Sequence, residues 1–137
     1  RHTRCSRDWS SDVCSSDLTV AATGSQAYRL LAALRAHYLR LGLVARIIPA
    51  VTYVVPENVR MIAPDRAEIT LCEVDGSWQM DSRRTASTDD DVVWDDSLVS
   101  RRARHTLVRE SGRWLRSGIT ELTLWPGENR CPPRPSV

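Results

Sequence analysis

Residues 97–125 read SLVSRRARHTLVRESGRWLRSGITELTLW, and this stretch decides the fold. Two strand-like runs flank Ser111-Gly112, a dipeptide that predicts a tight hairpin turn. Ser117-Gly118 predicts a bulge in the second strand. Strand alternation divides the first run into two faces: Val99, Arg101, Ala103, His105 and Leu107 on one, and Ser100, Arg102, Arg104, Thr106 and Val108 on the other. Neither set is uniformly apolar, so we expect a sheet with one helix-covered face and one partly wet face.

An amphipathic helix is predicted within residues 19–43. Apolar side chains recur there at helical spacing: Ala27, Leu30, Leu31, Leu34, Tyr38 and Leu41. Thr23 or Ser25 can cap the start of the helix, and Gly42 suits the left-handed position just after its end. A single amphipathic helix needs a sheet to cover its apolar stripe.

Three further strands are predicted at residues 44–55, 59–63 and 67–74, which are rich in β-branched or alternating apolar residues. Pro49 indicates a strand edge or a bulge. The polar residues 77–96 predict a long loop with a short strand around residues 92–94. The pattern as a whole predicts an α+β fold, with one main N-terminal helix packed on a curved antiparallel sheet of about four to six strands, a partial cone.

Five aspartates lie between residues 89 and 96. Carboxylates suit Ca²⁺ or Mg²⁺, so a cation site is one interpretation of this segment. An EF-hand loop needs a central glycine and a terminal glutamate, which this spacing does not supply. A solvated loop is therefore favoured, and we expect neither a metal nor a cofactor.

Composition narrows the class of protein. The 137 residues are 42% hydrophobic and 26% charged, as in an ordinary folded domain, and a net charge of +2 is too small to predict nucleic-acid binding. All the basic residues are arginine, and phenylalanine is missing as well. Both absences indicate a high-GC, bacterial genome. No apolar run reaches the ~20 residues that a transmembrane helix needs, so we expect no such segment in this fragment.

The first eighteen residues have no helix or strand pattern. Residues 8–18, DWSSDVCSSDL, resemble the conceptual translation of a common short-read sequencing adapter rather than any protein family. We therefore interpret residues 1–18 as a chimeric scar that has replaced the native N-terminus. Cys5 and Cys14 then stay out of the cysteine count, as an expression tag would.

Two cysteines remain, Cys72 in a predicted strand and Cys131 beyond the last one. An even count without companion metal ligands favours a disulfide that joins the C-terminal tail to the sheet. Two free buried thiols are the alternative. A disulfide would place the native protein outside the cytoplasm.

The chain resembles a group of uncharacterised actinobacterial secreted or lipoprotein-type domains in the nuclear transport factor 2-like, cystatin-like superfamily. The motifs that carry this resemblance are Thr70-Leu71-Cys72, the Gly112-Arg113-Trp114 turn and Cys131. The resemblance implies a truncated cystatin-like α+β domain at 19–131, followed by a Pro-rich tail at 132–137. Its helix would correspond to the third helix of that family, and the first two would have no counterpart.

Three functions remain open. The resemblance, together with the lack of a catalytic motif, implies a non-enzymatic extracytoplasmic domain, secreted or lipid-anchored, whose partner is unknown. A small-molecule isomerase or cyclase is the second possibility, with His105 as base in the sheet's cavity and Tyr53 and Glu121 as its partners. The third is an accessory module that assembles through its open sheet face, as a possible homo-oligomer. Fold alone does not choose among them.

Overall fold

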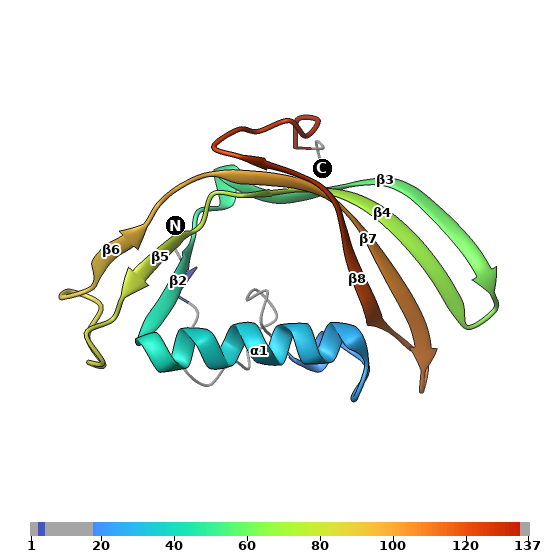
Figure 1. Ribbon diagram of the computed structural model, residues 1–137, viewed down its shortest axis with the longest axis horizontal. Helices are drawn as coiled ribbons and strands as arrows, with labels where there is room; N and C mark the ends of the chain where they lie inside the picture. Colours follow the sequence, from blue (N-terminus) through green and yellow to red (C-terminus); the bar gives the residue numbers. More distant parts are fainter. Residues whose placement is uncertain (1–2, 5–17, 135–137) are drawn as a thin grey trace.

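The structure is a computed structural model that describes residues 3–4 and 18–134. Strands make up 53% of it and helices 19%. The helical elements are η1 (Leu18–Val20), α1 (Gln26–Leu41) and η2 (Pro49–Val51). The strands are β1 (Thr3–Arg4), β2 (Leu43–Ile47), β3 (Thr52–Ala63), β4 (Arg66–Asp75), β5 (Trp78–Asp81), β6 (Val92–Asp95), β7 (Val99–Glu110) and β8 (Arg113–Pro126). One long helix lies beneath an arch of strands (Figure 1).

The expected α+β fold with a single curved sheet is wrong. The strands form two antiparallel sheets, a first sheet in the order β1-β2-β5-β6 and a second sheet in the order β3-β4-β7-β8. The first sheet has four strands only if the two-residue β1 is counted. The chain is therefore mostly β with a small helical part.

The two sheets are separated by breaks in each long run of strand. Pro49 begins η2 between β2 and β3, where its missing N–H cannot donate to a strand ladder. Gly76 lies between β4 and β5, and its N–H donates to the carbonyl of Val51 at 2.8 Å. A Cβ on Gly76 would lie 2.5 Å from Cγ2 of Val51, so the two runs bend together only if a glycine stands there.

Aspartate side chains form turns at the ends of two of these strands, β4 and β6. Oδ1 of Asp75 accepts from the Ser77 N–H at 3.0 Å, and Oδ1 of Asp95 accepts from the Ser97 N–H at 2.9 Å. Such Asx turns stop a strand by satisfying its next amide locally. The bend that separates the sheets is thus built from proline, glycine and aspartate.

The β7–β8 hairpin that the sequence predicted is confirmed. Ser111 and Gly112 both have positive φ, 50° and 76°, as a primed two-residue turn requires. The register jumps from Thr106↔Gly118 to Leu107↔Arg116. Ser117 is therefore the extra residue of the predicted bulge.

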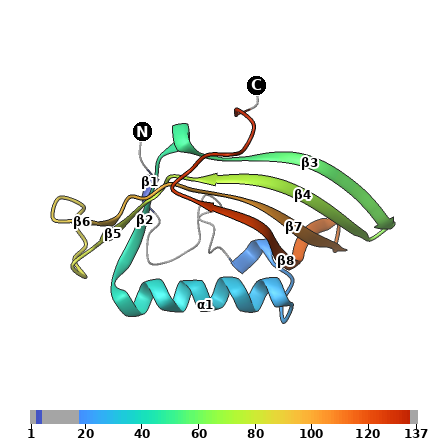
Figure 2. The same ribbon diagram turned by 45° about the horizontal axis from the view of Figure 1, so that its top comes forward.

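Helix α1 spans the arch and is fastened at both ends (Figures 1 and 2). At its start, Oγ of Ser25 accepts from the Tyr28 N–H, which identifies Ser25 as the cap. Nearby, the Gln26 amide exchanges two hydrogen bonds with the backbone of Ile119 on β8, at 2.7 and 3.1 Å. At its end, the carbonyl of Gly42 (φ 69°) accepts from the backbone N–H of Ser82 at 3.0 Å and from its Oγ at 2.7 Å.

The predicted apolar stripe is partly wrong. Ala27 and Leu31 are buried, whereas Leu30 and Leu41 are 47% and 42% exposed. Among the strands, the helix mainly contacts β8 and β2, and a narrower face is covered than the sequence pattern indicates. The short strand β5, which pairs with β2 and β6, was also missed, and only Met80 of its four residues is buried.

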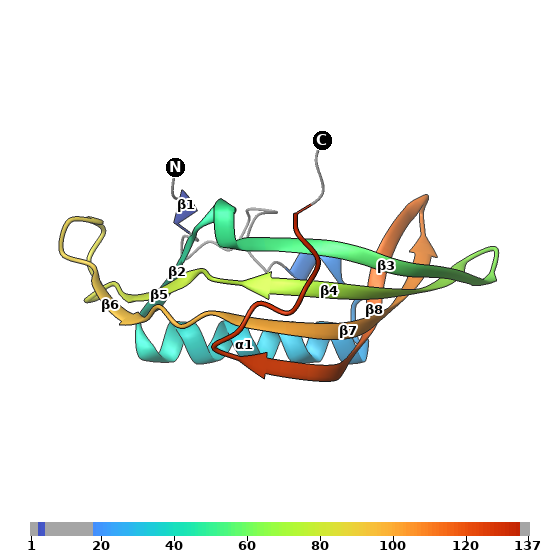
Figure 3. The same cartoon turned by 90° about the horizontal axis from the view of Figure 1, so that it is seen from above.

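The second sheet has two different faces. Its inner face looks toward α1, and its outer face carries the C-terminal tail, which crosses the strands after β8 (Figures 2 and 3). On the outer face, Oγ of Ser100 donates to the Glu128 carbonyl at 2.7 Å and accepts from the Arg130 N–H at 3.0 Å. The predicted disulfide Cys72–Cys131 is confirmed, with Cα atoms 5.5 Å apart.

The interpretation of residues 1–18 as a scar falls mostly on residues 1–2 and 5–17, outside the described part of the chain. Thr3 and Arg4 form β1 and pair with Ile47 and Arg46 of β2, where no strand was expected.

Candidate functional site

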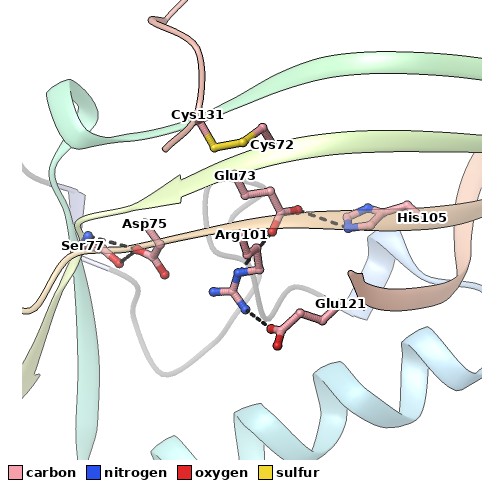
Figure 4. Close-up of polar contacts among 8 residues, drawn as sticks. All are labelled: Cys72, Glu73, Asp75, Ser77, Arg101, His105, Glu121 and Cys131. Atoms are coloured by element: carbon pink, nitrogen blue, oxygen red, sulfur yellow. Dashed lines mark hydrogen bonds and ion pairs between the residues drawn. A yellow bond between two sulfur atoms is a disulfide. The ribbon is translucent and has the colours of Figure 1, made fainter. Parts of the chain in front are cut away.

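The polar residues of the inner face form the candidate site. On β4 and β7, register places Glu73 opposite Arg101, Leu71 opposite Ala103 and Ile69 opposite His105. Ala103 lies between Arg101 and His105 on that face, and its short side chain leaves room above it. The imidazole and the carboxylate meet across that gap, with Nε2 of His105 3.1 Å from Oε1 of Glu73 (Figure 4).

Glu73 is the centre of a chain of charges. Its Oε2 lies 3.5 Å from Nε of Arg101, and NH1 of Arg101 lies 3.8 Å from Oε2 of Glu121 on β8. Both distances exceed a good hydrogen bond. Within the described part of the chain, Nε of Arg101 is buried and makes no hydrogen bond. Arg101 thus acts mainly as a positive charge beside Glu73.

These neighbours set the ionisation of Glu73. Burial raises the pKa of its carboxyl, but the hydrogen bond with His105 and the positive charges of His105, Arg101 and Arg116 together outweigh it. The pKa of Glu73 is therefore below its ordinary value. A carboxylate in this place is stabilised by its partners rather than poised to take up a proton.

Tyr38 of α1 faces the same region. Burial raises the pKa of its hydroxyl, and the negative charges of Asp75 and Asp95 raise it further, against a lowering by Arg101. The phenol is therefore held neutral. It belongs to the polar surroundings of the charge chain and is not an activated nucleophile.

The three residues predicted from sequence do not converge. His105 is on the inner face and only 4% exposed. The hydroxyl of Tyr53 donates to the Pro132 carbonyl at 3.1 Å and accepts from Asn129 at 3.0 Å, which places it under the tail on the outer face. Glu121 reaches His105 only through Arg101 and Glu73.

Sequence reasoning missed Glu73, the actual partner of His105. The signal was present: the alternation that places Ile69 and Leu71 on the inner face continues two residues later to Glu73. An acidic residue at an apolar-face position predicts a buried charge with a partner.

Open space lies elsewhere on the described surface. A hollow of about 150 Å³ at the end of α1 is lined by Tyr38, Leu39, Gly42, Leu43, Ser82 and Arg84. A shallower hollow of about 370 Å³ is lined by Asn58, Arg60, Glu68, Thr70 and Arg104. His105 borders neither of them.

Neither a metal-binding cluster nor a membrane-spanning helix occurs in the described residues. Residues 3–4 and 18–134 contain no group of three histidine, cysteine, aspartate or glutamate side chains arranged to hold a metal ion. In the same ranges, no helix is long and apolar enough to cross a membrane.

Comparison with known proteins gives a structural likeness. No protein-family model matches the chain, and no curated protein matches it either. The structure is similar to the intermembrane space region of the chloroplast protein ARC6, with a TM-score of 0.58 and 14% identity, over 81% of this chain and 79% of that one. At this identity the likeness shows a shared fold alone, and membership of the nuclear transport factor 2-like group stays a prediction.

Proposed function

We propose that this chain is a non-catalytic domain that works in an oxidising, extracytoplasmic compartment and acts by binding another macromolecule. The observation that carries the non-catalytic part is the burial of His105. A general base must come within hydrogen-bond reach of its substrate. The side chain of His105 is 5% exposed, and its Nε2 is already engaged by Glu73.

The disulfide supports the compartment. Disulfides persist in secreted, periplasmic and other oxidising settings and are rare in the reducing cytosol. Cys72 is fully buried and Cys131 ties the tail to it, so the bond is part of the folded domain. The likeness to an intermembrane space region is compatible with this location.

One observation favours the isomerase or cyclase alternative, namely the inward histidine beside a carboxylate. That arrangement serves a substrate only if one reaches the ring. Tyr53, which would have donated to the substrate, lies on the other face of the sheet. The alternative therefore lacks both access and its second polar group.

Chemical access to the two imidazoles in the described part of the chain tests this proposal. Diethyl pyrocarbonate is applied to the native protein, and the labelled peptides are quantified by mass spectrometry over time. His37 on α1 is exposed and is the internal control. We expect His105 to react at least about tenfold more slowly than His37, because reaction requires local opening of the sheet. Equal rates would show an accessible ring and would favour the enzyme.

A further inference from the structure

Strand β6 is an unusual edge. Val92, Val93 and Trp94 are three consecutive apolar residues, and they are 48%, 45% and 62% exposed. Successive side chains of a strand point to opposite faces. Consecutive exposure therefore means that neither face of β6 is covered, and such a run is a fault in a folded protein unless it has a function.

Trp94 is placed outward by a bulge. Val93 pairs with Met80 and Asp95 pairs with Gln79, so Trp94 is the extra residue with no partner on β5. Bulges at sheet edges re-aim a side chain. Tryptophan is also the residue type most enriched among those that dominate binding energy at interfaces.

The free edge of β6 leaves space for one more strand. β6 leads directly into β7, and β8 pairs with β7 as far as Val99↔Pro126. At Gly127 (φ 72°) the chain turns away, with its N–H bonded to the Leu98 carbonyl at 2.7 Å, and the tail then crosses the outer face (Figure 3). Within residues 3–4 and 18–134, no strand pairs with the free edge of β6, which is the last strand of its sheet.

The charges beside β6 indicate what kind of segment could pair with its free edge. Aspartates flank the apolar run on both sides: Asp89, Asp90 and Asp91 before it, and Asp95 and Asp96 after it. Hydrogen bonds from the side chain and backbone of Ser97 lower the pKa of Asp95, which favours its charged form. An antiparallel second copy of β6 would bring Asp95 and Asp96 against the other copy's aspartates, and like charges across strands repel.

We propose that β6 accepts an extended segment of another protein, apolar at alternate positions and basic at its ends, as an added antiparallel strand beside Trp94. Backbone hydrogen bonds along β6 would hold the segment, and the aspartates would set its charge preference. This inference rests on the proposed function and names the partner that a binding domain of this shape selects.

Binding of a model peptide to the whole 137-residue chain tests this proposal. The probe is fluorescein-labelled RKVTVTVKR, and the comparison probe is the charge-reversed EDVTVTVDE; binding is followed by fluorescence anisotropy at low salt. We expect saturable binding of the basic peptide and none of the acidic one. Trp94→Thr should weaken binding by about tenfold or more, whereas Trp114→Thr, at an exposed tryptophan of β8, should leave it unchanged.

Other results overturn the proposal. Equal loss of affinity for the basic peptide in the two tryptophan variants, or equal binding of the two peptides, would show that β6 is not the binding site. N-methylation at alternate amides removes backbone donors that strand pairing needs. If a basic peptide modified in this way binds as well as the unmodified one, the peptide does not bind as an added strand. A dimer in size-exclusion light scattering that Trp94→Thr dissociates assigns the edge to a second copy instead. The reactivity of His105 tests the proposed function and is measured without peptide. A failure of peptide binding at β6 is therefore distinguishable from a failure of the proposed function.

Discussion

Nε2 of His105 lies 3.1 Å from Oε1 of Glu73, and this contact joins β7 to β4 on the inner face. The two residues are not directly opposite in register, because Glu73 pairs with Arg101 and His105 with Ile69. Their side chains meet over the small Ala103. Removing Glu73 leaves the buried imidazole of His105 without its partner, and removing His105 leaves the partly buried Glu73 with only the charge of Arg101 beside it, at 3.5 Å.

The depressed pKa of Glu73 predicts a loss of stability in acid. Its ordinary value is 4.5, and the folded value is lower. A carboxyl with a lowered folded pKa adds stability that is present above the unfolded pKa and is lost as the pH falls through the folded one. Urea unfolding from pH 7 down to pH 3 should therefore show a steeper decline in the free energy of unfolding for wild type than for Glu73→Gln. Parallel curves would contradict this assignment.

The disulfide should contribute substantially to stability. It joins residues 59 apart in sequence, and closing a loop of that length is worth about 2–4 kcal/mol, mainly through the unfolded chain. The double variant Cys72→Ala/Cys131→Ala should lose that amount in urea unfolding. Reduction of wild type should lower its stability similarly, and adding reductant to the double variant should change nothing at this bond. An unchanged unfolding midpoint in the double variant would mean that the tail is held by its hydrogen bonds alone.

Gly76 should be intolerant of any side chain. A Cβ there would meet Val51 at 2.5 Å from a side-chain carbon and 2.8 Å from its carbonyl oxygen. Forcing this contact apart should cost about 2–3 kcal/mol, as overpacking does in cores. Gly112→Ala is the matched control: nothing lies within 4 Å of a Cβ there, so only the positive φ is penalised, by about 1–2 kcal/mol. Thermal unfolding compares them, and an equal or smaller loss at Gly76 would refute the close approach.

Local chemistry made the hairpin and the disulfide predictable. Ser111-Gly112 specifies a turn, and Ser117-Gly118 specifies a bulge wherever the flanking residues alternate. Cys72 could be assigned to the face opposite Leu71 by counting along β4. These features depend on a few neighbouring residues, so one sequence is enough to recognise them.

The two-sheet architecture needed information that no single segment holds. Pro49 and Gly76 are residue types that each tend to interrupt a strand. Their alignment in space, where the Gly76 N–H meets the Val51 carbonyl, follows from cross-strand register. Register is a tertiary property, so breaks that looked like strand ends became one bend between two sheets.

The candidate site was half predictable for the same reason. From sequence, His105 was named only as a possible base in the sheet's cavity, and its partners were guessed from residue type. Strand register places Tyr53 on the outer face, where its hydroxyl bonds the tail, and Glu73 was overlooked because it follows an apolar run. Partner choice depended on which strand lies beside β7, and the sequence does not state that.

A double-mutant cycle on His105 and Glu73 tests the central claim, that this buried pair supports the fold and does not carry out a reaction. The free energies of unfolding of wild type, His105→Gln, Glu73→Gln and the double variant are measured in urea at pH 7. Each single change should cost about 1–3 kcal/mol, and the double should cost less than their sum, because neither partner is then left unsatisfied. Single variants more stable than wild type would contradict the claim, since active-site groups are commonly retained at the expense of stability.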